Sequence, residues 1–323
     1  MKNNATNKLL QKAKESKSDE FYTQFSDIER ELKHYKDNFK NKVIYCNCDD
    51  PRVSNFYKYL VANFEELGLK RVIASCHKKQ ESSLFNNEEF KPGFFYKYSG
   101  KQNENKQPTL DDIIFFEEDG DFRSSESIEL LKESDIIVTN PPFSLFREYV
   151  DQLVKYDKKF LIIGNINAIT YKSIFNLIKQ NKIWLGINLG RGISGFIVPE
   201  HYKLYGTESG IDSLGNRIVS PNNCLWLTNL DNTQRYEDIL LTKKYYENKA
   251  NYLEYDNYDA INVNKTKDIP LDYTGVIGVP ITFLHKYNPK QFEIIKFRKG
   301  NNEKDLCING KCPYFRILIK RII

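Results

Sequence analysis

The stretch SDIIVTNPPFSLFREYV, residues 134–150, contains a strand, a rigid turn and a helix in succession. Residues 135–139 (DIIVT) are largely β-branched, which favours a buried strand. Ser144 is a suitable N-cap for a helix with one apolar face, formed by Leu145, Phe146, Tyr149, Val150 and Leu153. A loop between the end of a strand and the start of a helix is where open α/β sheets bind ligands. The segment therefore predicts both the fold class and the place of a site.

The turn itself, Asn140-Pro141-Pro142-Phe143, has residue types suited to methylation of a nucleobase amine. Such an amine is a poor nucleophile, because its lone pair is delocalised into the ring. The Asn140 side-chain oxygen and the Pro141 carbonyl can accept its hydrogens, and consecutive prolines stiffen the turn. Phe143 offers a flat face for a base taken out of the duplex. These four residues are the predicted catalytic residues.

The composition of the 323 residues is that of a water-soluble enzyme with a sizeable core and about two domains at most. There is no apolar run of about eighteen residues and no basic start followed by an apolar stretch with a cleavage site. We therefore expect neither a membrane span nor a signal peptide, and a cytoplasmic location.

Cysteine usage gives no sign of a metal centre. Cys307 and Cys312 have no second Cys or His pair at zinc-finger spacing, and a cytoplasmic setting disfavours a disulfide. The other four lie in apolar, strand-like runs, where a thiol is usually a small buried hydrophobe: Cys46, Cys48, Cys76 and Cys224. We expect no metal ion.

Positive charge is concentrated at the two ends of the chain. Residues 1–18 carry a net charge of +4 and residues 286–323 a net charge of +7, whereas the whole chain is +5. Basic ends beside an acidic middle suit binding to a polyanion. The C-terminal bases alternate with aromatic residues and favour DNA contact, with Lys296, Arg298 and Lys299 as candidates. For the N-terminal arm, solvation alone is an equal alternative.

Strand-like and helix-like segments alternate along most of the chain. The predicted strands are residues 42–48, 71–75, 110–116, 135–139, 159–164, 183–187, 195–198 and 224–228. A helix is expected from Asp50-Pro51 to about residue 68, and a polar insertion over 78–109. This order predicts an α/β fold with a doubly wound, mostly parallel sheet.

A cofactor site follows from that topology. The N-terminus of the helix after the first strand offers N–H groups and a positive dipole end, which suit the carboxylate of S-adenosylmethionine. Asp121 is well placed for the cofactor adenine. A glycine-rich loop after the first strand is absent, since Ser54 and Phe56 stand where glycines would be expected.

Several longer segments resemble the EcoRI-type family of DNA adenine methyltransferases nearly end to end. They are KSDEFYTQ (17–24), YCNCDDPRVSNF (45–56), GDFRSSESI (120–128), NPPFSLFREY (140–149), LGRGISGFIVPEHY (189–202), PNNCLWLTNL (221–230) and YDNYDAINVNKTKDIPLDY (255–273). The resemblance implies methyl transfer from S-adenosylmethionine to adenine N6 within GAATTC. It also implies a monomer that acts on double-stranded DNA beside a restriction endonuclease, without binding that endonuclease.

The resemblance also implies an organisation and a set of roles. A basic arm (1–18) precedes a cofactor-binding catalytic domain (19–235), and residues 236–323 form the target-recognition region. Asn140 and Pro141 hold the target amine, while Phe143 stacks the flipped adenine. The predicted cofactor residues are Tyr22, Asp50 and Asp121. Arg123 and Arg191 lie in Gly- or Ser-rich loops near the expected strand ends and are two further candidate DNA contacts, although a plain loop charge is an equal alternative for Arg191.

Three alternatives stay open at the level of sequence. An N4-cytosine methyltransferase uses similar chemistry. A protein glutamine methyltransferase also has an Asn-Pro-Pro-aromatic turn, but that reading leaves the basic tail without a polyanionic partner. The chain could also be a DNA-binding module without catalysis, which the glycine-free loop favours.

Overall fold

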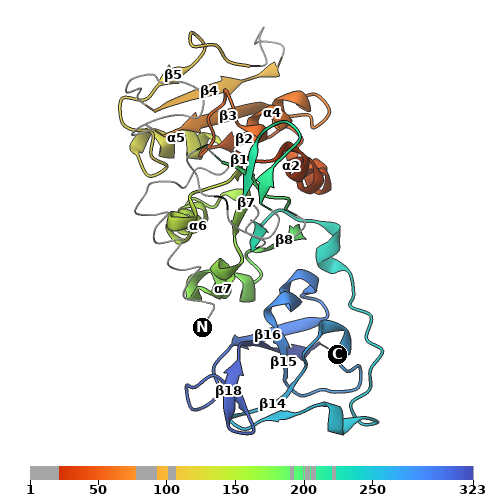
Figure 1. Cartoon of the computed structure of the whole chain (residues 1–323). Helices are drawn as coiled ribbons and strands as arrows, with labels where there is room; N and C mark the ends of the chain where they lie inside the picture. Colours follow the sequence, from red (N-terminus) through yellow and green to blue (C-terminus); the bar gives the residue numbers. More distant parts are fainter. Residues whose placement is uncertain are drawn as a thin grey trace. The chain divides into compact units, whose positions relative to one another are not determined.

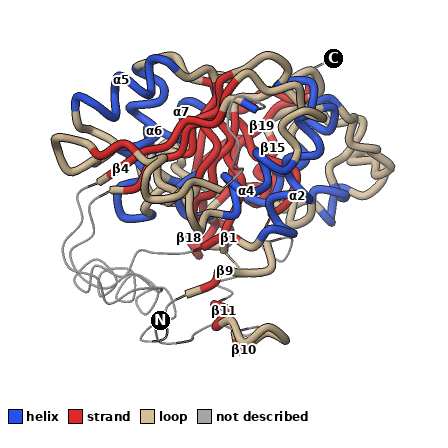
Figure 2. Tube along the Cα trace, turned by 90° about the horizontal axis from the view of Figure 1, so that it is seen from above, coloured by secondary structure: helices blue, strands red, loops and turns tan. Residues whose placement is uncertain are grey.

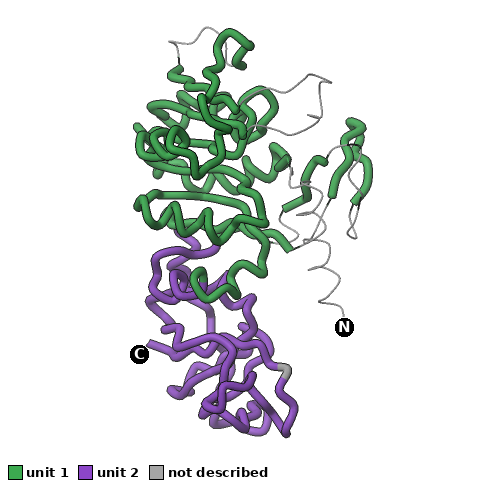
Figure 3. The backbone as a smooth tube through the Cα atoms, turned by 90° about the vertical axis from the view of Figure 1, so that its left-hand side faces the viewer, with its two compact units in different colours: residues 1–174, 186–230 green, residues 175–185, 231–323 purple. Residues whose placement is uncertain are grey.

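The computed structural model describes residues 22–77, 93–100, 107–189, 193–198, 200, 204, 209–219 and 223–322. The predicted N-terminal arm, Arg191 and most of the 78–109 insertion lie outside these residues. The chain forms two compact units (Figure 3): the first unit is Met1–Ile174 with Gly186–Leu230, and the second unit is Phe175–Leu185 with Asp231–Ile323.

An eight-stranded sheet dominates the first unit, in the order β5-β4-β3-β2-β6-β7-β12-β8. Its strands are β2 (Val43–Cys46), β3 (Arg71–Cys76), β4 (Phe94–Tyr98), β5 (Ile114–Phe115), β6 (Ile136–Thr139), β7 (Lys159–Asn165), β8 (Trp184–Leu189) and β12 (Cys224–Thr228). β3, β2, β6 and β7 are parallel, whereas β4, β5 and β12 run antiparallel to their neighbours. The α/β class is confirmed, but the sheet is mixed rather than mostly parallel.

Helices cover both faces of this sheet (Figures 1 and 2). α2 (Phe25–Leu32) and α4 (Asn55–Ala62) lie on one side, and α5 (Ser125–Glu133) and α6 (Phe146–Lys155) on the other. Alternate strand residues such as Ile44 and Val138 belong to the buried cluster that includes the α2 and α4 side chains. The intervening Tyr45 and Ile137 are fully buried as well. Burial of both faces explains why these strands are continuously apolar.

The remaining elements of the first unit are shorter. They are the 3₁₀ helices η1 (Lys33–Tyr35), η3 (Phe143–Leu145) and η4 (Ile166–Thr170), the helix α3 (Lys36–Phe39), and a small sheet of β1 (Tyr22–Thr23), β9 (Phe196–Ile197), β11 (Arg217–Val219) and β10 (Gly210–Ile211). The helix α7 (Lys172–Lys179) contributes residues to both units.

Some local predictions were wrong. The predicted insertion contains the strand β4, and the strand expected at 110–116 shrinks to the two residues of β5, where Ile114 and Phe115 are exposed. The helix after β2 starts at Asn55, with Ser54 rather than Asp50 as its N-cap. Ser144 is not the N-cap of α6, because it lies inside η3 and Leu145 takes that position.

Two buried carboxylates of α2 bind residues of β8 and of the segment before β9. Glu31 accepts the backbone N–H groups of Ile187 and Asn188, both at 2.8 Å. Asp27 accepts the backbone N–H and the hydroxyl of Ser194, also at 2.8 Å. Burial raises the pKa of Asp27, which the Ser194 hydrogen bonds oppose. These contacts fix the segment that leads into β9.

The second unit is built on a five-stranded sheet in the order β13-β14-β15-β19-β16. Its strands are β13 (Glu254–Tyr255), β14 (Tyr258–Asn262), β15 (Ile277–Pro280), β16 (Phe292–Phe297) and β19 (Arg316–Arg321), and a hairpin is formed by β17 (Leu306–Ile308) and β18 (Lys311–Tyr314). Four 3₁₀ helices complete its described elements: η6 (Thr233–Tyr236), η7 (Lys249–Asn251), η8 (Thr266–Asp268) and η9 (Ile281–Lys286).

The hairpin corrects one expectation about the cysteines. Asn309 and Gly310 both have positive φ, 50° and 73°, as the Asn-Gly turn of a two-residue hairpin requires. This turn brings Cys307 and Cys312 together in a disulfide. The sequence argument considered only metal spacing and compartment, whereas local hairpin geometry sets which side chains meet.

Among the described residues, no helix is long and apolar enough to cross a membrane.

Candidate active site

The carboxyl ends of the parallel strands lie at one edge of the sheet, where polar residues follow them. β2 connects through α4 to β3 on one side, and β6 connects through α6 to β7 on the other. Because β2 and β6 are neighbours, the connections diverge between them, which is the point where open α/β sheets bind ligands. Residues 47–50 follow β2, and residues 140–143 follow β6.

Asp49 bridges the two strand ends. It accepts hydrogen bonds from the hydroxyl of Ser54 at 2.8 Å and from the hydroxyl of Thr139 at 2.5 Å. Burial raises the pKa of Asp49 to about 6, and the two hydroxyls oppose that rise. Thr139 directly precedes Asn140, so this carboxylate fixes the start of the catalytic turn relative to the loop after β2.

The loop after β2 is held by side chains instead of glycines. Asp50 accepts the backbone N–H of Arg52 at 2.9 Å and its guanidinium at 3.0 and 2.8 Å. The Ser54 hydroxyl accepts the backbone N–H groups of Phe56 and Tyr57. The helix N-terminus predicted to receive a cofactor carboxylate is therefore largely satisfied by its own residues, because Ser54 takes that position.

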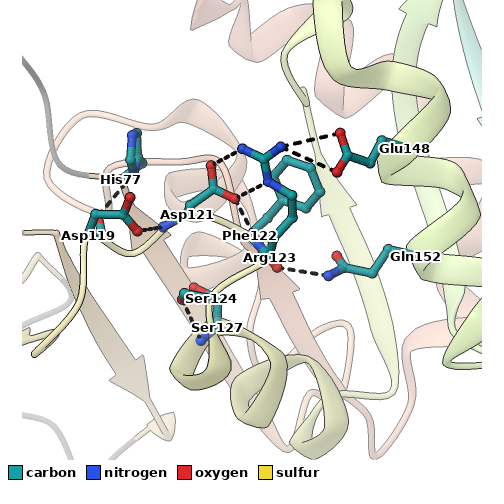
Figure 4. Close-up of polar contacts among 9 residues, drawn as sticks. All are labelled: His77, Asp119, Asp121, Phe122, Arg123, Ser124, Ser127, Glu148 and Gln152. Atoms are coloured by element: carbon teal, nitrogen blue, oxygen red, sulfur yellow. Dashed lines mark hydrogen bonds and ion pairs between the residues drawn. The ribbon is translucent and has the colours of Figure 1, made fainter.

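The Asp121 loop repeats the same arrangement (Figure 4). Asp121 accepts the backbone N–H of Arg123 at 2.9 Å and its guanidinium at 2.7 and 2.8 Å, and Arg123 also pairs with Glu148 of α6 at 3.3 Å. Burial raises the pKa of Asp121, but the contacts with Arg123 outweigh it and lower the pKa below its ordinary value. The predicted cofactor ligand and the predicted DNA contact thus bind each other.

Aromatic and amide contacts tie this loop to the end of β2. The Phe122 ring meets that of Tyr149 edge to face, with centroids 5.1 Å apart, and the Tyr149 hydroxyl donates to the Asn47 side-chain oxygen. Burial, followed by the nearby carboxylates of Asp49 and Asp121, raises the pKa of Cys48. Asp121 therefore lies close enough to the residues after β2 to act in the same site.

The catalytic turn is partly buried. Pro141 is buried, Asn140 and Phe143 are half-buried, and the Asn140 side-chain oxygen is itself buried. The turn leads through η3 into α6, whose first residue, Phe146, packs where a Cβ on Gly164 would lie only 2.5 Å from its ring. Gly164 of β7 thus lets the helix after the turn approach the sheet closely.

Tyr22 reaches this region through the small sheet. β1 pairs with β9, with Tyr22 opposite Ile197 and Thr23 opposite Phe196. The Phe196 ring meets Phe143 edge to face at 6.2 Å, and the side chain of Asn55 donates to the Thr23 carbonyl at 2.9 Å. The strand that carries Tyr22 therefore contacts both the first turn of α4 and a partner of Phe143, one of the predicted catalytic residues.

The other predicted DNA contacts lie in the second unit. Arg298 forms a two-pronged ion pair with Asp305 at 2.6 and 3.1 Å, and Lys299 approaches the same carboxylate at 3.6 Å. Lys296 lies over the Tyr258 ring at 4.6 Å. Arg191 is outside the described residues. One carboxylate thus neutralises part of this basic group.

The family model for the adenine-specific methyltransferase EcoRI matches residues 9–322. The chain belongs to this family. It is 70% identical to the type II methyltransferase M.EcoRI of Escherichia coli over 99% of this chain and 98% of that protein. It is also 39% identical to M.MpnI of Mycoplasma pneumoniae and 37% identical to M.MgeORF184P of Mycoplasma genitalium, each over 96% of this chain and at least 97% of the relative. No solved structure matches the chain.

Membership of the EcoRI methyltransferase family establishes the activity. The chain is an adenine-specific type II methyltransferase that acts on DNA. Cytosine and protein glutamine are therefore excluded as targets. A DNA-binding module without catalysis is excluded as well.

Sequence reasoning about this EcoRI-type site missed Asp49 and Thr139. The sequence favours Asp50 instead, because an Asp followed by a proline is typical of an N-cap at the start of a helix. The signal that was available is the pair of adjacent carboxylates at the end of a buried strand, followed five residues later by a serine. That spacing lets the first carboxylate accept from Ser54 while the second binds Arg52.

Proposed function

We propose that this methyltransferase modifies adenine N6 within GAATTC, with S-adenosylmethionine as methyl donor. The observation that carries the proposal is 70% identity to M.EcoRI over 99% of the chain. A change of recognition sequence is not expected at this identity over full length. The same comparison supports a role as the modification partner of a restriction endonuclease, as a monomer in the cytoplasm.

The chemistry of the sheet edge fits that cofactor. S-adenosylmethionine carries a sulfonium and an ammonium group, and three carboxylates, Asp49, Asp50 and Asp121, lie on the loops of this edge. A carboxylate accepts about four hydrogen bonds, and Asp50 and Asp121 each receive three from their arginines. Each therefore keeps one acceptor position on its Oδ2. We assign Asp121 to the cofactor adenine and Asp50 with Tyr22 to the rest of the pocket.

The bound cofactor supplies an electrophilic methyl group, and the chain's own residues prepare the adenine. We assign two acceptors to the target amine, the Asn140 side-chain oxygen and the Pro141 carbonyl. Hydrogen bonds to both of its hydrogens favour a pyramidal nitrogen with a localised lone pair. Asp49 holds Thr139, and thereby the backbone of the turn, so that these acceptors need no reorganisation during the reaction.

Phe143 is the residue we assign to the flipped base. Its ring is half-buried and meets the Phe196 ring in a T-shaped contact, and an aromatic face is the kind of surface on which a flipped base stacks. The contact with Phe196 restrains the Phe143 ring, so a stacked base would be fixed in plane before the amine meets its acceptors.

Residues 236–323 are the proposed target-recognition region, with Lys296, Arg298 and Lys299 as backbone contacts. The support is the net positive charge of the last 38 residues and their alternation with aromatic side chains. The contribution of Arg298 and Lys299 is reduced by their shared partner Asp305. In the first unit, Arg123 is a weaker candidate for DNA contact, because two carboxylates already bind it.

The test is protection of DNA. Purified protein and S-adenosylmethionine are incubated with a plasmid that contains one GAATTC site, and the plasmid is then challenged with the endonuclease that cuts GAATTC. We expect cofactor-dependent protection that Asn140→Ala abolishes. Methylated adenine elsewhere without protection would refute the recognition sequence. Protection by the Asn140→Ala variant would refute the assignment of the catalytic turn.

A further inference from the structure

Arg316, the first residue of β19, is held in place by two amide side chains. Its Nε donates to the Asn262 side-chain oxygen at 3.1 Å, and its Nη2 donates to the Asn264 side-chain oxygen at 2.8 Å. The Tyr314 ring lies 5.3 Å from the guanidinium carbon. Asn262 is itself fixed, because its oxygen also accepts the Tyr255 hydroxyl at 2.8 Å and its amide nitrogen donates to Asn264. The guanidinium is therefore oriented before any ligand arrives.

The partners of Arg316 orient it without neutralising its charge. Arg52, Arg123 and Arg298 each pair with a carboxylate. By contrast, within the described part of the chain no carboxylate forms an ion pair with Arg316. Burial raises the pKa of Tyr255, and the positive charge of Arg316 opposes that rise. A fixed, half-buried guanidinium that keeps its charge is suited to an electron-rich ligand.

The N–H donors of Arg316 that the two amides do not occupy define the kind of ligand. A guanidinium has five N–H donors, and the two amides occupy one on Nε and one on Nη2. Of the remaining three, one on Nη1 and one on Nη2 point the same way at the end of the guanidinium. Two parallel donors match the O6 and N7 acceptors of guanine in the major groove. Asn264, which supports the fork, is exposed, so the cluster opens to the surface.

We propose that Arg316 reads guanine at the outer base pair of the recognition site. This inference rests on the proposed function, because GAATTC contains guanine only at that pair. A phosphate is the other ligand that a guanidinium fork takes. We favour the base because reading a defined sequence requires donors held toward base edges, and the experiment below separates the two ligands by the N7 acceptor that only guanine has.

The experiment compares guanine with 7-deazaguanine, which lacks the N7 acceptor. Two duplexes that differ only in both outer guanines are methylated at one salt concentration by wild type, Arg316→Gln and Lys320→Gln, and kcat/KM is measured. Lys320 is an exposed lysine of the same strand, and its loss removes the same charge. We expect wild type and Lys320→Gln to lose about tenfold on the 7-deazaguanine duplex, whereas Arg316→Gln, already about ten- to a hundredfold slower on guanine, loses no more.

An equal 7-deazaguanine penalty in wild type and Arg316→Gln would overturn the proposal and leave Arg316 as a phosphate or structural residue. No penalty in wild type would overturn it as well. If Arg316→Gln fails to melt cooperatively, Arg316→Lys takes its place, because it keeps the charge and loses the fork. Failure of wild type to methylate the unmodified duplex would instead refute GAATTC as the substrate, which separates the two claims.

Discussion

The two units use charged side chains in opposite ways. At the sheet edge of the first unit, Asp50 and Asp121 are each bound by an arginine two residues later. In the second unit, Arg316 is held by amide oxygens and keeps its charge. Neutralised pairs give rigid loops that do not repel a ligand, as a catalytic site needs. Uncompensated charge on a fixed fork gives attraction and direction, as reading of DNA needs.

Removal of the Asn140 side chain should have the largest effect on methylation. It removes an acceptor from the proposed catalytic turn and leaves the charge arrangements of both units intact. We expect Asn140→Ala to slow single-turnover methylation about 10²- to 10³-fold, with an unchanged melting temperature. Transfer of a radiolabelled methyl group to a GAATTC duplex measures the rate. Asn176→Ala, on the exposed side of α7, is the matched control. A drop of less than about fivefold would contradict the assigned role, because the amine acceptor would lie elsewhere.

The buried Asp49 should make the stability of the first unit depend on pH. Its pKa of about 6 lies above the ordinary value of 3.8, so between these values the folded protein binds more protons than the unfolded chain. The free energy of unfolding therefore falls as pH rises through this window, by about 3 kcal/mol from this group.

Asp49→Asn should remove that dependence, because its side chain does not titrate. Urea unfolding of wild type and variant at several pH values between about 4 and 6.5 gives the difference in slope. Parallel curves for the two proteins would show that Asp49 has an ordinary pKa and does not act as the buried bridge between Ser54 and Thr139.

Asp305 is the carboxylate that neutralises Arg298 and Lys299 in the second unit, so its replacement should leave these two charges uncompensated. Asp305→Asn releases Arg298 and Lys299, so we expect tighter DNA binding and an increase of about one in the slope of log affinity against log salt. Glu293→Gln removes one negative charge from an exposed position of β16 in the same unit and is the control. Equal salt slopes for the two variants would mean that Arg298 and Lys299 do not reach phosphate.

The smallest effect is expected from the Asp121 pair. Arg123 is 46% exposed on its side chain, so its ion pairs are screened, and Arg123→Gln should cost less than about 1 kcal/mol of stability. The released Asp121 should change the affinity for S-adenosylmethionine, which titration calorimetry measures. A stability loss above about 2 kcal/mol with unchanged cofactor affinity would make Asp121 a structural residue.

The strands and the catalytic turn were accessible from sequence because their signals are local. Residues 136–139 are β-branched and residues 224–228 are mostly apolar, and β6 and β12 lie there. The start of α4 was missed, since Asp50-Pro51 and Ser54 are both plausible N-caps and only the bond from Ser54 to Asp49 decides between them. β4 was missed because it lies within a polar stretch.

What the sequence alone determined is the α/β class, the position of the Asn140-Pro141-Pro142-Phe143 turn after a buried strand, and the family, because these depend on residue order and periodicity. What only the tertiary structure decided is which charges meet. Asp49 and Thr139 are 90 residues apart, and Asn262 and Arg316 are 54 apart. Strand pairing and register set such contacts, and no local pattern carries them.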